Sequence, residues 1–376
     1  MPTTTYSLPS ELLIEIFNYE KCFRQLVQYS LVCKRWNKLA DSVILSRNIT
    51  LYSEDAAWIF YHFLVSSPEK SKSVKYLTVD PPHCNLEPFR MILKLAFTPC
   101  MESFEGEIEG TRFFNELLLI AGEEIEYGRL RTIPASWNYS TTYDSLLHRF
   151  KSTLECIKLN FHESCRYNTK NLTMLYHLNQ IENLTSLTLN SDVHDILKAE
   201  NILKNCNQIK DLDINLSIGT NITNVEQFNV WIQEDVTRSN TLRSLKIRFS
   251  KDRQWHIVDY LVYKYPKIEK IVVERLPVVD SWIRSSIVLP MDIQTIKTVL
   301  EKISNVKIYQ LECIVAARQV KDITRLLDTD HYVKIFDYLP YYLLQKIELV
   351  LDIQSKCPKR RILPIKFPQI EPLYIH

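Results

Sequence analysis

The sequence is poor in glycine. Only five glycines occur among 376 residues, and none stands in a GxGxxG or GxxxxGK[ST] arrangement. Phosphate-binding loops need glycine because the backbone must approach the phosphate closely. The scarcity therefore argues against a Rossmann or P-loop nucleotide-binding enzyme. Asparagine tolerates left-handed backbone conformations, so we expect it to supply many of the turns.

Motifs that carry catalytic or metal chemistry are also missing. The sequence has no GxSxG, no HExxH and no CxxC, the spacings typical of serine hydrolases, zinc proteases and RING-type zinc sites. The nearest metal-like cluster is Cys156, His162 and Cys165, and it lacks a fourth ligand at zinc-finger spacing. The carboxylates of residues 107–126 fit a solvated helix face. We therefore predict no cofactor, no metal and no enzymatic activity.

Signals for membranes and export are absent too. The N-terminus has no basic region followed by an apolar core, and no window offers the roughly 18 apolar residues of a membrane span. The nine cysteines are scattered without regular spacing, as expected for reduced thiols. A net charge of +2 gives no general reason to expect nucleic acid or an anionic membrane. We expect a protein of the cytoplasm, the nucleus or both.

The first fifty residues carry a helical pattern. Pro9 can begin a helix because its fixed φ suits the first turn, and an apolar stripe follows it. That stripe consists of Leu12, Leu13, Ile16 and Phe17. The apolar residues of a second helical stretch are Leu26, Tyr29, Leu31, Val32, Cys33, Trp36, Leu39 and Ala40. We predict two or three short helices, with Cys33 acting as a small apolar residue on the helical face between Val32 and Trp36.

Two segments of this region resemble an F-box. "LPSELLIEIFNY" and "SLVCKRWNKLA" stand in the order and separation typical of that family, across residues 8–40. Many members carry a leucine, and often a proline, just after the tyrosine that matches Tyr19. Here Glu20-Lys21-Cys22-Phe23 follows and the connection is longer, so we expect Phe23 to replace the missing apolar contact.

The resemblance implies docking to a Skp-family adaptor and, through it, to a cullin. Independently of the resemblance, so short a helical segment cannot bury enough surface to be stable alone, and its spare apolar surface must meet a partner. The residues assigned to the adaptor-facing role are Leu8, Pro9, Leu12, Ile16, Phe17, Val32 and Trp36. We expect Leu13 and Leu31 to pack internally.

From about residue 74 a repeating template, apolar-x-x-apolar-x-apolar, takes over. Clear copies begin at Val74, Leu154, Leu184, Ile209, Leu242 and Ile268, and weaker copies begin at Met101, Leu130, Val306 and Leu344. The period-two alternation near the end of each copy predicts a short strand, and helical patterns such as "WHIVDYLVYKYP" stand between copies. One strand and one helix per repeat is typical of a leucine-rich-repeat solenoid. An ordinary α/β domain with parallel strands is the alternative.

We therefore predict an α/β fold in two domains: an all-helical F-box over residues 1–50 and a leucine-rich-repeat solenoid over residues 51–376. The solenoid would have about ten irregular repeats, with parallel strands on its concave face and helices on its convex face. The whole chain then resembles a fungal-type F-box protein with leucine-rich repeats. That resemblance implies the substrate receptor of a Skp–cullin–F-box ubiquitin ligase, which holds a target protein for ubiquitination and proteasomal degradation.

The non-apolar positions of each strand are expected to line the concave face. The candidate substrate-binding residues are Lys158, Asn160, Thr188, Asn190, Asp211, Asp213, Asn215, Lys246, Arg248 and Glu274. They form two columns, one running from Asn160 to Glu274 and one from Lys158 to Val272, with an acidic step beside a basic step. The alternative is a solvated face whose opposite charges only stabilise adjacent strands.

Two other functions stay open. The chain could act as an F-box protein in a complex that is not a ligase. It could also be a nucleic-acid-binding repeat protein that uses "CKRWNK" and a basic C-terminal segment. That segment carries Lys356, Lys359, Arg360, Arg361 and Lys366, and we interpret it as a solvated tail.

Overall fold

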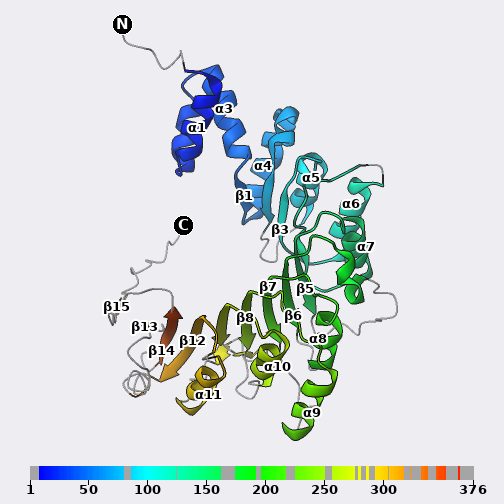
Figure 1. Cartoon of the computed structure of the whole chain (residues 1–376). Helices are drawn as coiled ribbons and strands as arrows, with labels where there is room; N and C mark the ends of the chain where they lie inside the picture. Colours follow the sequence, from blue (N-terminus) through cyan, green and yellow to red (C-terminus); the bar gives the residue numbers. More distant parts are fainter. Residues whose placement is uncertain are drawn as a thin grey trace. The chain divides into compact units, whose positions relative to one another are not determined.

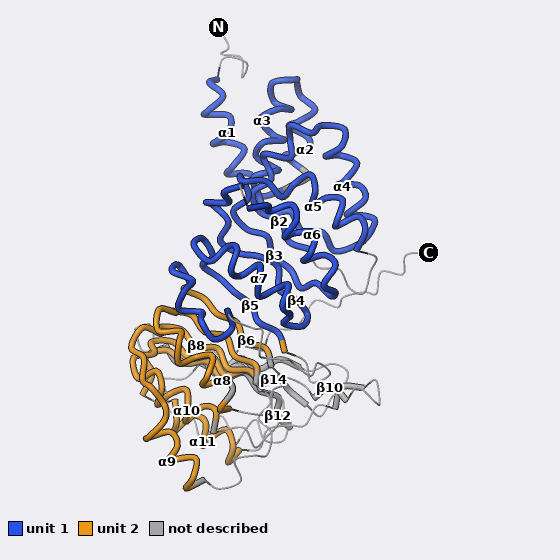
Figure 2. The backbone as a smooth tube through the Cα atoms, turned by 90° about the vertical axis from the view of Figure 1, so that its right-hand side faces the viewer, with its two compact units in different colours: residues 1–160, 165–184 blue, residues 161–164, 185–376 orange. Residues whose placement is uncertain are grey.

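A computed structural model describes most of the chain. The described residues are 8–79, 86–123, 125–161, 174–191, 196–216, 225–249, 256–275, 278–280, 285–287, 293–303, 305–316, 322, 332–337, 344–352 and 363–364. They form two compact units, residues 1–160 with 165–184, and residues 161–164 with 185–376 (Figure 2). Within the described part of the chain, every helix is too short or too polar to cross a bilayer.

Three short helices open the first unit, as predicted: α1 (Ser10–Tyr19), α2 (Phe23–Ser30) and α3 (Lys34–Leu45). Their shared core contains the fully buried side chains of Phe17, Leu26 and Ala40. The Phe17 ring stacks on Tyr29 at 5.2 Å between ring centroids. It also meets Trp36 edge-on at 5.3 Å. These aromatic contacts join all three helices in one small core.

The second helical stretch is interrupted, which corrects the interpretation of Cys33. Helix α2 ends at Ser30, and Cys33 is the N-cap of α3, in an extended conformation. Its Sγ accepts a hydrogen bond from the Trp36 backbone N–H at 3.5 Å. A free N–H in the first turn of a helix needs such an acceptor. Cys33 therefore begins a helix, and it does not lie on the apolar face of one.

Parallel strands and helices alternate in the rest of the first unit. In chain order these are β1 (Asn48–Leu51), α4 (Glu54–Ser66), β2 (Tyr76–Val79), α5 (Glu87–Ala96), β3 (Ser103–Ile108), α6 (Thr111–Ala121), β4 (Ala135–Ser136), α7 (Thr141–Arg149) and β5 (Cys156–Phe161). The 3-10 helices Pro68–Ser73, Met174–Tyr176 and Leu178–Gln180 complete this unit. The sheet order is β1-β2-β3-β4, and each helix from α4 to α7 packs against the next (Figure 1). Strand β1 straddles the predicted domain boundary at residue 50, so that boundary stays a prediction.

The second unit repeats the alternation. Its first elements are β6 (Ser186–Ser191), α8 (Ile196–Leu203), β7 (Asp211–Leu216), α9 (Val225–Asp235), β8 (Ser244–Phe249), α10 (His256–Lys264), β9 (Lys270–Arg275), α11 (Ile293–Ile303) and β12 (Ile308–Ala316). Strands β6 to β9 and then β12 lie side by side and parallel, with the helices along one face (Figure 1). The template's apolar strand positions, such as Leu187, Leu245 and Ile271, are buried, which confirms that they face inward.

The C-terminal strands depart from the predicted parallel pattern. Strand β14 (Leu344–Asp352) pairs antiparallel with β12 and with β13 (Tyr332–Asp337), and β15 (Leu363–Pro364) pairs with β13. Strands β10 (Val278–Asp280) and β11 (Ser285–Ile287) form a separate antiparallel pair. The prediction of one more parallel strand for the copy at Leu344 is therefore wrong. Period-two alternation fits antiparallel and parallel strands equally, so the template could not distinguish them.

Candidate docking surface and strand face

The N-terminal helices leave large apolar side chains exposed. Leu12 and Ile16, one turn apart on α1, are 45% and 50% exposed, and Val32 after α2 is 52% exposed. We define the exposed apolar surface as Leu12, Ile16, Tyr19, Val27, Leu31 and Val32. The first three follow i, i+4, i+7 spacing and form one stripe along α1. A small helical segment gains nothing by exposing so much apolar area, unless a partner covers it.

The residues assigned to the adaptor-facing role differ in how exposed they are. Leu12, Ile16 and Val32 are exposed, as is Pro9, and Leu8 is half-buried. Phe17, in contrast, is fully buried in the three-helix core, so its assignment to an outward-facing role is wrong. Trp36 is half-buried and its ring packs on Phe17.

The two residues expected to pack internally also differ in exposure. Leu13 is 1% exposed, which confirms its internal position, but Leu31 is 79% exposed. The reason is the break after Ser30, which places Leu31 in a turn rather than on the inner face of a helix. Tyr19, the most exposed of the set at 86%, was not among the predicted adaptor-facing residues. Its i+7 spacing from Leu12 was the available signal.

The strand register of the second unit confirms the predicted columns there. Asn190, Asn215, Arg248 and Glu274 are register partners across β6, β7, β8 and β9. Thr188, Asp213, Lys246 and Val272 form the neighbouring column. The side chains of both columns are partly accessible. We refer to these two columns together as the strand face.

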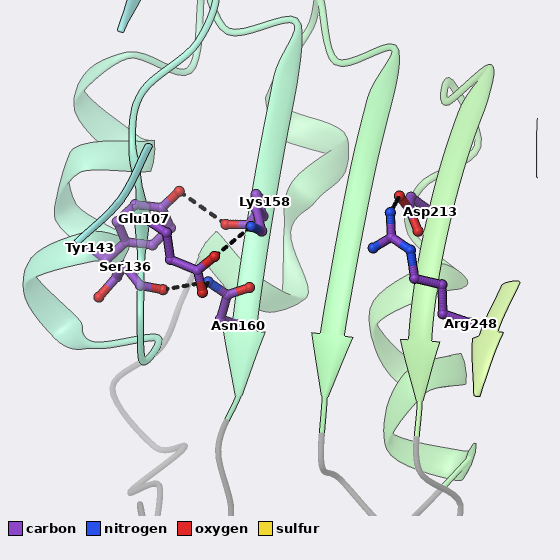
Figure 3. Close-up of polar contacts among 7 residues, drawn as sticks. All are labelled: Glu107, Ser136, Tyr143, Lys158, Asn160, Asp213 and Arg248. Carbon is purple, nitrogen blue, oxygen red and sulfur yellow. Dashed lines mark hydrogen bonds and ion pairs between the residues drawn. The ribbon is translucent and has the colours of Figure 1, made fainter. Parts of the chain in front are cut away.

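The charges of the strand face pair with one another. The Arg248 guanidinium contacts Asp213 Oδ2 at 2.6 Å (Figure 3). It also contacts Glu274 Oε2 at 3.3 Å. Lys246 Nζ lies 2.7 Å from the same Glu274 oxygen. The predicted acidic and basic steps therefore neutralise each other across three strands. Asp211, two residues before Asp213 on the same strand, is exposed.

In the first unit, the predicted site residues Lys158 and Asn160 sit in a closed polar network on β5. Asn160 is 1% exposed, and its Nδ2 donates to Glu107 Oε1 at 2.9 Å and to the Ser136 carbonyl at 3.0 Å. Lys158 Nζ lies 2.6 Å from Glu107 Oε2, and the Tyr143 hydroxyl donates to the Lys158 carbonyl (Figure 3). Asn160 therefore ties strands together and cannot contact a target, which corrects its assignment.

Backbone hydrogen bonds also connect the residues just before the strands of successive template copies. In the first unit the Glu102 N–H donates to the Lys75 carbonyl and the Arg131 N–H to the Glu102 carbonyl, both at 2.8 Å. In the second unit the Arg243 N–H donates to the Lys210 carbonyl, also at 2.8 Å. Each residue holds the same position of its template copy. Ion pairs accompany these bonds, for example between Lys75 and Glu102 at 3.1 Å.

A buried polar cluster lies among the helices of the second unit. Lys264 Nζ on α10 lies 2.8 Å from Glu200 Oε1 on α8, with the two side chains 1% and 8% exposed. The Tyr260 hydroxyl donates to the same carboxylate. Burial lowers the pKa of Lys264, raises that of Tyr260, and raises the pKa of the nearby Cys206 thiol to about 12. The cluster therefore joins α8 to α10 through buried polar contacts.

Among the described residues, no three His, Cys, Asp or Glu side chains lie together as a group that could hold a metal ion. Cys156 lies on β5, whereas His162 and Cys165 lie outside the described residues. The five basic residues near the C-terminus, Lys356 to Lys366, also lie outside them.

Comparison with known families identifies the N-terminal region. Residues 5–52 match the F-box-like family. This range contains α1, α2, α3 and all six residues of the exposed apolar surface. F-box domains generally bind Skp-type adaptors, and the match supports an F-box protein with an adaptor role in ubiquitin ligase complexes. A comparison with curated protein sequences finds no significant match.

Proposed function

We propose that this chain is the substrate-recognition subunit of a Skp–cullin–F-box ubiquitin ligase. The observation that carries the proposal is the exposed apolar surface inside the F-box-like region. Exposed apolar groups are costly in an isolated protein, and burying one such side chain contributes about 1.5–3 kcal/mol. A Skp-family adaptor that covers Leu12, Ile16 and Val32 would recover that free energy.

The remaining strands and helices would form a leucine-rich-repeat solenoid that binds the target. Two observations support this interpretation. Residues at equivalent template positions hydrogen-bond to each other in successive copies, for example Lys75 with Glu102 and Lys210 with Arg243. The strand columns also present partly accessible polar side chains in register. Stacked repeats with an in-register polar face are typical of solenoid binding proteins.

The mechanism would be proximity, without catalysis by this chain. Tethering raises the effective concentration of target lysines near the conjugating enzyme that the cullin recruits. The transfer chemistry would belong to the other subunits, and the complex would act in the cytoplasm, the nucleus or both. Degradation of the ubiquitinated target by the proteasome would follow.

The direct test is capture of a purified Skp-family adaptor by the intact chain. The variant to compare is Leu12→Ala with Val32→Ala, because both side chains are exposed and their truncation leaves the core intact. The matched control is Leu119→Ala, an apolar residue on α6 that is 80% exposed outside the F-box-like region. We expect the control to bind like the wild type and the double variant to bind at least tenfold more weakly. A wild-type chain that captures no adaptor would refute the proposal.

Further outcomes separate the ligase from its alternatives. Co-purification of a neddylated cullin with the adaptor supports the ligase, and its absence favours an F-box complex without ligase activity. Binding to nucleic acid at low salt that weakens steeply as salt rises would support the nucleic-acid interpretation instead. Proximity labelling from the intact chain, with a chain lacking residues 185–376 as control, would identify the target.

A further inference from the structure

Helix α1 carries half of the exposed apolar surface but has no capping side chains of its own. Its N-cap is Pro9, which makes no side-chain capping bond, and its last turn contains no basic residue. The last carbonyls of a helix have no partner within the helix and carry partial negative charge. The Glu20 N–H donates to one of these carbonyls, that of Phe17, and donors from other elements can bind this end of α1 as well.

Two arginines, Arg35 on α3 and Arg47 just after it, bind the chain at the two ends of α1. At the start of α1, Arg35 Nη2 donates to the Leu8 carbonyl and, at 3.1 Å, to Ser10 Oγ. At the end of α1, Arg47 Nη2 donates to the Phe17 carbonyl at 2.9 Å and also to the carbonyl of Glu20. Arg35 thus holds the chain where α1 begins, and Arg47 binds the carbonyls where α1 ends.

The spacing of the two arginines matches the helix that they hold. Arg35 and Arg47 are twelve positions apart, and the helical part of that span, from Arg35 to the end of α3 at Leu45, rises about 15 Å at 1.5 Å per residue. Helix α1 has 10 residues, or about 15 Å. The bonds of each arginine come from its Nη2, whose N–H directions are fixed by the guanidinium plane, whereas the N–H groups of a lysine ammonium rotate freely on a flexible stem.

Helix α3 packs against both α1 and α2, so it supports both halves of the exposed apolar surface. The α1 half contains Leu12, Ile16 and Tyr19, and the other half, on α2 and the turn after it, contains Val27, Leu31 and Val32. We propose that Arg35 and Arg47 are positioning residues for adaptor docking, which set these two halves in the relative orientation that one adaptor surface can cover. This inference rests on the proposed function.

The test measures the affinity of the intact chain for the purified adaptor by calorimetry, together with the melting temperature. The variants are Arg35→Lys, Arg47→Lys and the double change. The matched control is Arg149→Lys, because Arg149 on α7 holds the end of α6 in the same way, through the carbonyls of Gly122 and Ile125. The binding stoichiometry reports the folded fraction, so lost folding is distinguished from lost affinity.

We expect the double variant to bind with unchanged stoichiometry and at least tenfold weaker affinity, with each single variant intermediate. The Arg149→Lys chain should lose a similar amount of thermal stability and bind within twofold of the wild type. If the double variant binds like the wild type, or if Arg149→Lys weakens binding equally, the positioning role is refuted while the proposed function stands. A wild-type chain that does not bind the adaptor refutes both.

Discussion

The F-box-like helices expose apolar side chains, whereas the strand face carries charged side chains that pair with one another. Six large apolar side chains stay exposed between Leu12 and Val32, a short stretch that contains α1, α2 and the turn after α2. On the strand face, by contrast, the charged groups of Asp213, Arg248 and Glu274 already pair with one another. The first region leaves apolar side chains uncovered in the free protein. The second is electrostatically satisfied in the free protein.

This difference decides what can be inferred about each partner. An exposed apolar surface carries an unfavourable hydration free energy, so its chemistry specifies that a partner is apolar. A face whose charges are internally paired gives no such specification, because any partner must first compete with the existing ion pairs. The adaptor class is therefore inferred from the structure and the family match, and the target is not.

The largest expected effect comes from placing charge on the exposed apolar surface. Leu12→Asp with Val32→Asp should weaken adaptor binding by at least about 100-fold, because two buried apolar contacts are lost and two carboxylates would be desolvated. Leu119→Asp, at the exposed apolar site on α6, should leave the affinity unchanged. Calorimetric titration measures both. If the double variant bound the adaptor within threefold of the wild-type affinity, the exposed apolar surface would not be the docking surface.

The second prediction concerns the buried ion pair between helices α8 and α10 of the second unit. Lys264→Met leaves the buried Glu200 carboxylate without its ion pair, so we expect a loss of about 3–5 kcal/mol in the unfolding free energy of the second unit. The control Lys302→Met removes a more exposed ion pair with Asp259 and should cost about 1 kcal/mol or less. Urea unfolding followed by amide exchange in α10 measures the difference. Equal losses would show that burial does not strengthen the pair's contribution.

The third prediction is loss of stability at high pH. Burial raises the pKa of Tyr143, Tyr260 and Tyr265 above the ordinary value of 10.0, so the native chain keeps protons that the unfolded chain loses. Their stabilisation is complete below pH 10 and falls by about 1.4 kcal/mol per pH unit and per group above it. The lowered pKa of Lys264 acts in the opposite direction up to its unfolded value. Chemical unfolding from pH 8 to pH 11 should therefore show a free energy of unfolding that falls above pH 10.

A substitution identifies the source of that pH dependence. Tyr143→Phe removes one titrating group and one hydrogen bond to the Lys158 carbonyl. It should lower the free energy of unfolding at pH 8 by about 1 kcal/mol and make its decline above pH 10 shallower. An unchanged slope would exclude Tyr143 as a contributor.

The fourth prediction is a small effect on the strand face. Arg248→Gln removes ion pairs with Asp213 and Glu274, whose side chains are about a quarter exposed. Solvent screening limits the expected loss of stability to about 1 kcal/mol, and adaptor affinity should not change. Target labelling should fall if this face binds the target. Unchanged labelling by this variant and by Asp213→Asn would contradict the strand face as the receptor surface.

The smallest effect is expected at Cys33. As an N-cap it should tolerate serine, whose oxygen is a better acceptor, so Cys33→Ser should keep or slightly raise the melting temperature. Cys33→Ala should cost about 0.5–1 kcal/mol. If Cys33 instead contributed by apolar packing, alanine would be the milder change. Thermal unfolding of the two variants distinguishes these outcomes.

Much of the fold followed from the sequence because its signals are periodic. The spacing of Leu187 and Leu189 and of their counterparts in the other copies predicted buried strand positions, and those positions are buried. The three N-terminal helices followed from apolar spacing and from the F-box resemblance. The antiparallel β14 did not follow, because strand alternation carries no information about direction.

The candidate sites were predicted less completely, for identifiable reasons. Phe17 and Ile16 are adjacent apolar residues of one helix, and only the packing of Tyr29 and Trp36 decides that Phe17 points inward. Asn160 belongs to the predicted polar column, yet Glu107 and Ser136, distant in sequence, enclose it. The roles of Arg35 and Arg47 depend on contacts with backbone carbonyls, which no side-chain pattern reveals.

Amide hydrogen exchange of the intact chain with and without a purified Skp-family adaptor tests the central claim most directly. The account predicts slower exchange in α1, in α2 and through Val32 when the adaptor is present, with β6 to β9 unchanged. Protection confined to the strands, or no protection anywhere in residues 10–32, would contradict it.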